Sequence, residues 1–361
     1  MKRTWVFLFL LAFTFSFASC SNKPEPETAS KASTPAPAPT PFKIERVGLP
    51  DVPAPPDNPL TVDRVALGKQ LFFDTRLSKN GNMSCETCHQ PDRGWTDGKV
   101  LSEKFDGSMN TRHTPTLYNV AYYKEYYWDG RAATLEAQIL AAWKGQMGGD
   151  PDAVVATLNG IEGYKNAFQK AVGGPATPDA VTKSLASFVR TLVSDNSPWD
   201  RYEKGDKSAV PEDAIKGFAV FSDSDKANCT LCHLPPTYTD ALFHNVGVGF
   251  DKPNPDLGRG KILADKAQQS GGDVAEAHKL DGAFKTPTVR SISESAPYFH
   301  DGRAATLEDA VDFMLRGGIK NPHLDEKLKA RKITAQERTQ LLAFLKSLTP
   351  EAKPFEKPQL P

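Results

Sequence analysis

Hydrophobic residues recur at helical spacing in the parts of the chain that are expected to fold. The clearest case is residues 180–192, in which one helix face carries an apolar stripe: Val181, Leu185, Phe188, Val189 and Leu192. Residues 334–347 predict a second well-marked helix, because Thr334 and Glu337 form a capping box in front of it.

Shorter helices are predicted along the rest of the chain. Residues 66–73 and 215–221 have similar apolar patterns, and another helix is expected to begin at Leu135 with Thr134 as its N-cap. Residues 152–171 predict two short helices with a break between them. No strand pattern of any length is present, so the predicted fold class is mostly α.

Residues 1–20 have the pattern of an export signal. Lys2 and Arg3 precede an apolar run that is too short to cross a bilayer comfortably. The run ends in F-A-S-C at Cys20, which resembles a bacterial lipoprotein signal whose cysteine becomes lipidated. A plain secretory signal with an incidental cysteine is the alternative. Both predict export to the bacterial periplasm, and the first adds a membrane anchor through Cys20.

Two further segments lack apolar periodicity. Residues 21–59 are rich in proline and alanine and predict a disordered tether, with the folded part beginning near Leu60. Residues 247–280 are rich in glycine, aspartate and lysine, and we expect them to form a surface excursion.

The same short motif occurs twice. C-x-x-C-H stands at residues 85–89 and again at 229–233, and each copy is followed by the tripeptide T-P-T. An identical octapeptide, D-G-R-A-A-T-L-E, then begins at Asp129 and at Asp301. Two motifs in matched order, followed by eight identical residues, indicate an internal duplication.

Length and charge agree with two domains. The chain has 361 residues, enough for about two domains of ordinary size. Its 44 basic residues balance its 44 acidic ones, which gives no indication of a nucleic-acid partner or a polybasic membrane patch. We therefore expect two domains, at residues 60–205 and 206–349, and a tail at 350–361.

The repeated motif is typical of c-type haem attachment, so we expect both to be cytochrome c-like haem domains. Two thiols form thioether bonds with the haem vinyl groups, and the adjacent histidine ligates the iron. The alternatives are a redox dithiol, half of a zinc site or a disulfide, but the trailing histidine in both copies favours haem. The expected haem-binding residues are Cys85, Cys88 and His89 for the first haem, and Cys229, Cys232 and His233 for the second.

Differences between the copies should indicate separate roles. In the helix after the octapeptide, Met314 of the second copy corresponds to Ala142 of the first, and Gln138 corresponds to Ala310. A methionine on an apolar helix face is more often part of the core. Here it could supply the sixth ligand of the second haem iron, while the first haem stays open to substrate. Trp128 precedes the first octapeptide, where it either packs or bridges the haems.

These features together resemble the bacterial di-haem cytochrome c peroxidases and the MauG-like enzymes. The resemblance covers residues 60–348 and includes R-x-T-P-T-L, Y-W-D-G-R-A, F-H-N-V-G-V and A-P-Y-F-H-D-G. It implies that the N-terminal haem reduces hydrogen peroxide and that electrons arrive at the C-terminal haem from a cytochrome c or cupredoxin. It further implies an inter-haem role for Trp128, a distal-pocket role for Gln138 and iron ligation by Met314, where MauG-like proteins have tyrosine.

Three departures from the family pattern bear on mechanism. The loop after the first motif, residues 90–112, lacks the histidine that blocks the resting peroxidatic haem in many relatives. The family's distal glutamate corresponds to Gln146, and an amide cannot act as a general base. The asparagine that helps to hold an inter-haem calcium is His113, and imidazole is a poor calcium ligand.

The leading functional prediction is an exported, lipid-anchored di-haem peroxidase that reduces hydrogen peroxide to water. One alternative is a MauG-like oxidase that acts on a protein side chain. A non-catalytic electron carrier or peroxide sensor is the other, and Gln146 makes it credible. The resemblance also allows a homodimer.

Overall fold

A computed structural model describes residue 1, residues 38–352 and residues 354–361. The predicted signal after residue 1, Cys20 and residues 21–37 of the predicted tether lie outside the described residues. Pro39–Pro361 forms a unit of its own. Among the described residues, no helix combines the length and the apolar character needed to cross a membrane.

Helices account for most of the regular structure, as the sequence predicts. Two three-residue strands, β1 (Phe243–Asn245) and β2 (Ala283–Lys285), pair antiparallel with Phe243 opposite Lys285. The helices are α1 (Val62–Phe72), α2 (Leu135–Gly145), α3 (Pro151–Gly160), α4 (Glu162–Val172), α5 (Pro178–Arg190), α6 (Pro198–Glu203), α7 (Glu212–Ser222), α8 (Gly258–Ser270), α9 (Val274–His278), α10 (Leu307–Leu315) and α11 (Ala335–Ser347).

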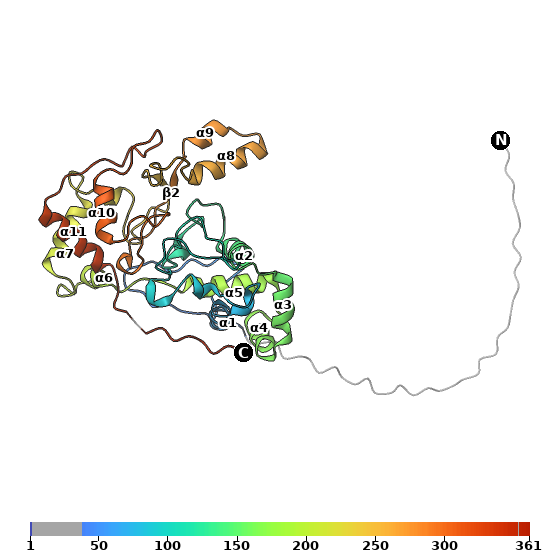
Figure 1. Cartoon of the computed structure of the whole chain (residues 1–361). Coiled ribbons are helices and arrows are strands. Elements are labelled where there is room, and N and C mark those ends of the chain that lie inside the picture. Colours follow the sequence, from blue (N-terminus) through green and yellow to red (C-terminus); the bar gives the residue numbers. More distant parts are fainter. Residues whose placement is uncertain (2–37, 353) are drawn as a thin grey trace, which may run out of the picture. The chain divides into compact units, whose positions relative to one another are not determined.

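Two helix pairs have the same construction. Helix α1 packs on α5, and α7 packs on α11 (Figure 1). A Cβ atom at Gly68 of α1 would overlap the Ser184 carbonyl oxygen, and one at Gly217 of α7 would overlap the Gln340 carbonyl oxygen. Glycine at these two positions therefore lets each pair of helix backbones approach closely.

Each helix pair has its own hydrophobic core. Leu71, Phe72 and Phe188 belong to one cluster of buried residues, which lies within residues 67–192. Phe221 and Phe344 belong to a second cluster, within residues 199–348. The two clusters follow the order of the two C-x-x-C-H motifs along the chain. Within Pro39–Pro361 we therefore call residues 39–205 the first unit and residues 206–349 the second unit.

The predicted helix starts are confirmed by their caps. The Thr134 hydroxyl accepts a hydrogen bond from the Ala137 N–H at 3.1 Å, and α2 begins at the next residue. Thr334 and Glu337 form the expected capping box of α11. The break predicted within residues 152–171 falls at Ile161, between α3 and α4.

The excursion at residues 247–280 is more ordered than its composition predicts. It contains α8 and α9, and Gly258 and Gly260 of α8 are buried. Helix α8 is tied to the first unit, because Arg259 pairs with Glu125 at 2.8 Å. The sequence did not predict these helices, since they carry no regular apolar face and depend on contacts distant in the chain.

The packed part of the chain begins before Leu60, which corrects the predicted boundary of the tether. The Phe42 N–H donates to the Leu60 carbonyl at 3.0 Å. Asn58 is fully buried and its side chain hydrogen-bonds Glu136 and Arg64, each at 2.8 Å. Polar contacts of this kind produce no apolar periodicity, so the sequence does not predict that this segment is packed.

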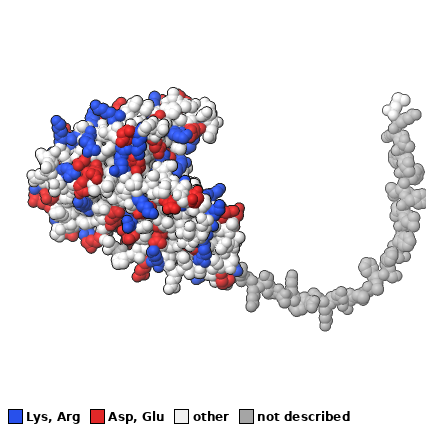
Figure 2. Space-filling model, viewed as in Figure 1, with Lys and Arg blue, Asp and Glu red and all other residues white. Residues whose placement is uncertain are grey.

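Charged side chains of both signs are interspersed on the face drawn in Figure 2. This distribution agrees with the equal numbers of basic and acidic residues in the sequence. On this face, neither sign gathers into one broad patch.

Candidate functional site

Both C-x-x-C-H motifs adopt the same backbone turn. A short 3-10 helix spans Cys85–Thr87 in the first motif and Cys229–Leu231 in the second. The His89 N–H donates to the Cys85 carbonyl at 3.0 Å, and the His233 N–H donates to the Cys229 carbonyl at 2.9 Å. The turn therefore gathers two sulfur atoms and one imidazole at each site, and the four cysteines form no disulfide with one another.

Each motif histidine is oriented by a carbonyl a few residues downstream. His89 Nδ1 lies 2.8 Å from the Trp95 carbonyl oxygen, and His233 Nδ1 lies 3.1 Å from that of Tyr238. A proton on Nδ1 leaves Nε2 free as a ligand. Burial lowers the pKa of both histidines, which keeps the imidazoles neutral, as iron ligation requires.

The residues that supply these carbonyls have an unusual backbone conformation. Trp95 has φ 60° and Tyr238 has φ 52°, in the left-handed region that bulky residues rarely adopt. Such a conformation costs about 1–3 kcal/mol and persists only where the surroundings hold it. Packing holds both residues here, since Trp95 is 4 % exposed and Tyr238 is fully buried.

Three of the four motif thiols are poor candidates for thiolate chemistry. Burial raises the pKa of Cys85 and of Cys229 to about 12, and that of Cys88 to about 11. Among the described residues, one group of three potential metal-ligating side chains lies close enough to share an ion, namely Cys232, Asp240 and His244. It contains a single cysteine, so it is not the two-cysteine half of a zinc site.

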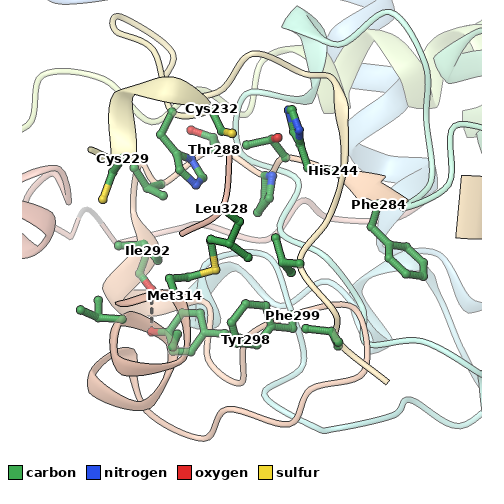
Figure 3. Close-up of a pocket in the computed structure, with 18 of the residues that line it drawn as sticks. Cys229, Cys232, His244, Phe284, Thr288, Ile292, Tyr298, Phe299, Met314 and Leu328 are labelled. Atoms are coloured by element: carbon green, nitrogen blue, oxygen red, sulfur yellow. Dashed lines mark hydrogen bonds between the residues drawn. The ribbon is translucent and has the colours of Figure 1, made fainter. Parts of the chain in front are cut away.

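A largely apolar cavity lies beside the second motif. Cys229 and Cys232 are on one side of it, and Met314 and Tyr298 are on the other (Figure 3). His233 also lines this cavity, together with Leu307, Ala310 and Val311 of α10. The walls fit a large apolar group that is attached through both sulfur atoms and ligated by the histidine.

The structure brings Met314 to the same cavity as His233. Leu307, Ala310 and Val311 are buried, while Met314, one turn after Ala310, is half-buried and borders the open space. Figure 3 shows its sulfur near Leu328, within the cavity. A thioether in this position could ligate an iron from the side opposite the histidine.

The corresponding helix of the first unit presents amides instead. Gln138, Ala142 and Gln146 follow one another at four-residue spacing, so they share one side of α2 and its C-cap. The Gln138 side chain is half-buried, and its backbone carbonyl accepts from the Tyr127 hydroxyl at 3.3 Å. Gln146 Oε1 is buried and has no hydrogen-bond partner among the described residues, which fits a polar ligand that is bound in the functional protein.

Trp128 lies where the two units meet. It lines the cavity of the second motif, although it belongs to the first unit. Its indole N–H donates to the His113 carbonyl at 2.9 Å, and its own carbonyl accepts from the Lys285 N–H at 2.8 Å. In return, the His113 N–H donates to the His300 carbonyl at 2.7 Å. The residue before each T-P-T segment therefore donates to the residue before the octapeptide of the other unit, across the junction.

His113 and Lys285 occupy corresponding positions but differ in charge. His113 is 3 % exposed, with Nδ1 2.8 Å from the Lys99 carbonyl oxygen, and burial lowers its pKa. Lys285 is 8 % exposed, and its ammonium donates to the Glu125 carbonyl at 2.7 Å. Burial lowers the pKa of Lys285 to about 8. Sequence reasoning gave this lysine no role, although its place in the duplication could have indicated one.

His244 is held by two carboxylates that are distant from each other in sequence. Its Nε2 lies 2.8 Å from Asp240, and its Nδ1 pairs with Asp325. The neighbouring Cys232 side chain and these two carboxylates raise the pKa of His244 above its ordinary value. The sequence did not indicate Asp325, because it lies in a different loop.

Comparison with known proteins identifies relatives over most of the chain. Residues 62–208 match the family described as di-haem cytochrome c peroxidase. The chain is 39 % identical over 298 residues to methylamine utilization protein MauG of Methylophilus methylotrophus, covering 82 % of this chain and 85 % of that protein. It is 36 % identical over 323 residues to cytochrome-c peroxidase IdrP1 of Pseudomonas sp. (strain SCT), covering 83 % and 84 %.

A solved structure agrees with these matches. The crystal structure of a MauG-like protein associated with microbial copper homeostasis superimposes with a TM-score of 0.73 and 28 % identity, covering 86 % of this chain and 95 % of that one. Since the paired motifs, the half-buried histidines with lowered pKa values and the sequence relatives agree, the chain belongs to the di-haem cytochrome c peroxidase and MauG family.

Proposed function

We propose that this protein is a peroxidase that catalyses H2O2 + 2 e⁻ + 2 H⁺ → 2 H2O, with electrons from a cytochrome c or cupredoxin. Cys85, Cys88 and His89 bind the N-terminal haem, at which peroxide reacts. Cys229, Cys232, His233 and Met314 bind the C-terminal haem, which receives the electrons. The family supplies the pair of c-type haems, and the division of labour between them is our inference.

The difference between Met314 and Ala142 carries this proposal. Both residues stand at the same position of corresponding helices, and Met314 borders the cavity that His233 lines. Ligation of a bound haem iron by this thioether would close it to substrate and favour its reduced state. Ala142 has no donor atom, so it would leave the other iron without a ligand from this position.

The bound haems supply the electron storage and the peroxide chemistry, and the protein supplies position and polarity. His89 and His233 hold their irons from one side, each fixed by a backbone carbonyl. Gln138 and Gln146 offer amide groups that orient a peroxide or a water molecule. Trp128, packed across the junction, is the proposed bridge between the two sites.

Internal duplication accounts for the correspondences between the units. Support comes from the glycines Gly68 and Gly217, each beneath the backbone of a closing helix, and from the left-handed aromatics Trp95 and Tyr238. We place the domain boundaries at residues 60–205 and 206–349, with the N-terminal domain extended by the packed residues that precede Leu60.

Steady-state peroxide consumption with a reduced cytochrome c tests the catalytic proposal. The peroxidase is expected to turn over, whereas an electron carrier or peroxide sensor would react with peroxide without sustained consumption. Electron paramagnetic resonance of the oxidised protein is expected to show one high-spin haem, because Ala142 would supply no sixth ligand at the first site. A fully low-spin spectrum would contradict the open site.

A MauG-like oxidase is the second candidate, because proteins named MauG are among the similar sequences, at 39 % and 41 % identity. That activity would oxidise a protein side chain and would not need a small electron donor. Met314 favours the peroxidase, since the resemblance gives MauG-like enzymes a tyrosine at this position. Peroxide consumption that depends on the donor separates the two.

Export and lipidation at Cys20 remain part of the proposal. The signal pattern supports them, and thioether formation with haem suits a compartment outside the cytoplasm. Cys20→Ser should release the protein from the membrane fraction into the periplasm while leaving its haem content unchanged. Membrane association that survives this change would contradict the anchor.

A further inference from the structure

The segment that follows α11 leaves the second unit and runs along the first. We call residues 350–352 and 354–361 the tail. Gln70 Nε2 donates to the Gln359 carbonyl at 3.3 Å, and Arg76 donates to the Pro361 carbonyl at 3.0 Å. Figure 1 shows the end of this segment beside α1 and α4. The tail therefore connects the closing helix of the second unit to the surface of the first.

Phe355 of the tail packs on the residue that orients His89. Its ring lies 5.2 Å from the Trp95 ring in an edge contact and 5.5 Å from the Phe73 ring in a stacked one. The ammonium of Lys69 lies 4.5 Å from the centre of the Phe355 ring. Phe355 thus covers Trp95, which holds a left-handed conformation and whose carbonyl hydrogen-bonds His89.

Lys357 makes a second, independent contact with the first motif. Its ammonium pairs with the Glu86 carboxylate. Glu86 stands between Cys85 and Cys88, and its side chain is only 22 % exposed. The tail therefore touches the haem-attachment turn itself as well as the residue that supports its histidine.

The second motif has no such cover from the tail. Tyr238 orients His233 as Trp95 orients His89, and it packs on Phe221 and Phe344 of its own unit. It is fully buried without help from the tail. The tail therefore supports the first motif, whereas the second is supported by its own unit.

We propose that Phe355 and Lys357 are positioning residues for the N-terminal haem. Phe355 keeps Trp95 in the conformation that directs its carbonyl to His89 Nδ1, and Lys357 fixes the turn between Cys85 and Cys88. This inference rests on haem ligation by His89, which is part of the proposed function. It makes the ligand geometry of one haem depend on a segment that the other unit supplies.

The expected consequence follows from the hydrogen bond at Nδ1. Donation of this proton makes an imidazole a more basic ligand and fixes the plane of its ring. Loss of the Phe355 ring should let Trp95 relax and weaken the bond. The ligand then donates less charge to iron, so the reduction potential of the N-terminal haem should rise.

Phe355→Ala in the full-length holoprotein tests this, with the exposed neighbour Glu356→Ala as the matched control. Resonance Raman spectra of the reduced protein should show the iron–histidine band of the N-terminal haem shifted to lower frequency. Its potential should rise while that of the C-terminal haem stays unchanged, and peroxidase turnover should fall about tenfold, the typical lower effect of such partners. A band and potential equal to those of Glu356→Ala overturn the proposal.

Four further variants keep the test decisive. If Phe355→Ala loses the N-terminal haem, Phe355→Leu should keep it with a smaller shift of the same band, and an unshifted band overturns the role of Phe355. For the ion pair, Glu86→Lys and Lys357→Glu should each disturb the band, and the double exchange should restore it. A double variant no better than the single ones overturns the role of Lys357. Both readouts are spectroscopic, so they stand even if the protein proves not to be a peroxidase.

Discussion

The two C-x-x-C-H units share the surroundings of the motif and differ in the helix that follows the octapeptide. Both use a short turn, a half-buried histidine with a lowered pKa, and a left-handed aromatic whose carbonyl orients that histidine. In the helix after the octapeptide, the second unit has Met314 at the cavity beside its motif, whereas the first has Ala142 with the amides Gln138 and Gln146. A few side chains of a single helix therefore carry the difference on which the two proposed roles depend.

Each unit also contributes an aromatic residue that packs on the other. Trp199, in the segment after α5, packs on Phe218 and Phe344 of the second unit. Phe355, in the segment after α11, packs on Phe73 and Trp95 of the first. Each closing helix is thus followed by an aromatic residue that packs on the other unit.

Exchanging the residues that differ most should give the largest effect. Ala142→Met should place a thioether at the open site and reduce peroxide turnover to the background rate, because the substrate position is then occupied. Met314→Ala should abolish the weak near-infrared band of sulfur-to-iron charge transfer and lower the potential of the C-terminal haem. Absorption spectroscopy and redox titration check both variants, and a wild-type protein without the near-infrared band would refute ligation by Met314.

Restoring a carboxylate to the first unit should give the next largest effect. Gln146→Glu should raise the rate of reaction with peroxide about a hundredfold, because a carboxylate can take up and return the proton that an amide cannot move. The buried environment of Gln146 Oε1 should raise the pKa of that carboxyl group toward a useful range. Stopped-flow mixing with peroxide measures the rate.

Gln138→Glu is the matched control, since it adds the same charge at a position assigned to hydrogen bonding. No gain from Gln146→Glu, with haem spectra intact, would show that another group moves the proton.

Because the two helix pairs are built alike, the same glycine substitution should destabilise both units to the same extent. Gly68→Ala and Gly217→Ala should each lower the free energy of unfolding by about 2–3 kcal/mol, because the added Cβ overlaps a backbone carbonyl. Urea denaturation checks this. Gly160→Ala has open space around its Cβ and should change the free energy by less than about 1 kcal/mol. Unequal losses at Gly68 and Gly217 would break the correspondence.

Substitution of Lys285 should have the smallest effect on the free energy of unfolding, and this effect should depend on pH. Its pKa, lowered to about 8 by burial against the opposing attraction of Glu125 and Asp129, lies below that of the unfolded chain. The unfolded state therefore binds more protons between pH 8 and about 10.4, and this residue makes the protein more stable as the pH rises through that range.

Lys285→Met should remove this dependence and raise the free energy of unfolding at pH 7 by about 1 kcal/mol, since the lost hydrogen bond and ring contacts offset part of the gain. Thermal unfolding across the pH range measures it, and the exposed Lys279→Met is the control. Parallel pH profiles in wild type and Lys285→Met would contradict the burial of a charged amine.

Much of the fold could be predicted because the caps and apolar stripes of helices are formed by residues that are close together in the sequence. The caps at Thr134 and Thr334 and the stripe of residues 180–192 depend on neighbours within a few positions. Helix α8 and the strands β1 and β2 could not be predicted, because they form only where distant segments meet. The same reason explains why the folded part begins before Leu60. Asn58 is held there by Glu136, which is distant in the sequence, as well as by the nearby Arg64.

The sequence by itself determined the two attachment motifs, their order and the residues that distinguish them. These follow from covalent chemistry, which needs two cysteines and a histidine at fixed spacing, and from alignment of the chain with itself. Tertiary structure decided which carbonyl orients each histidine, that Met314 shares a cavity with His233, and that the tail reaches the first motif. Those outcomes depend on packing between residues up to hundreds of positions apart, which no local pattern in the chain encodes.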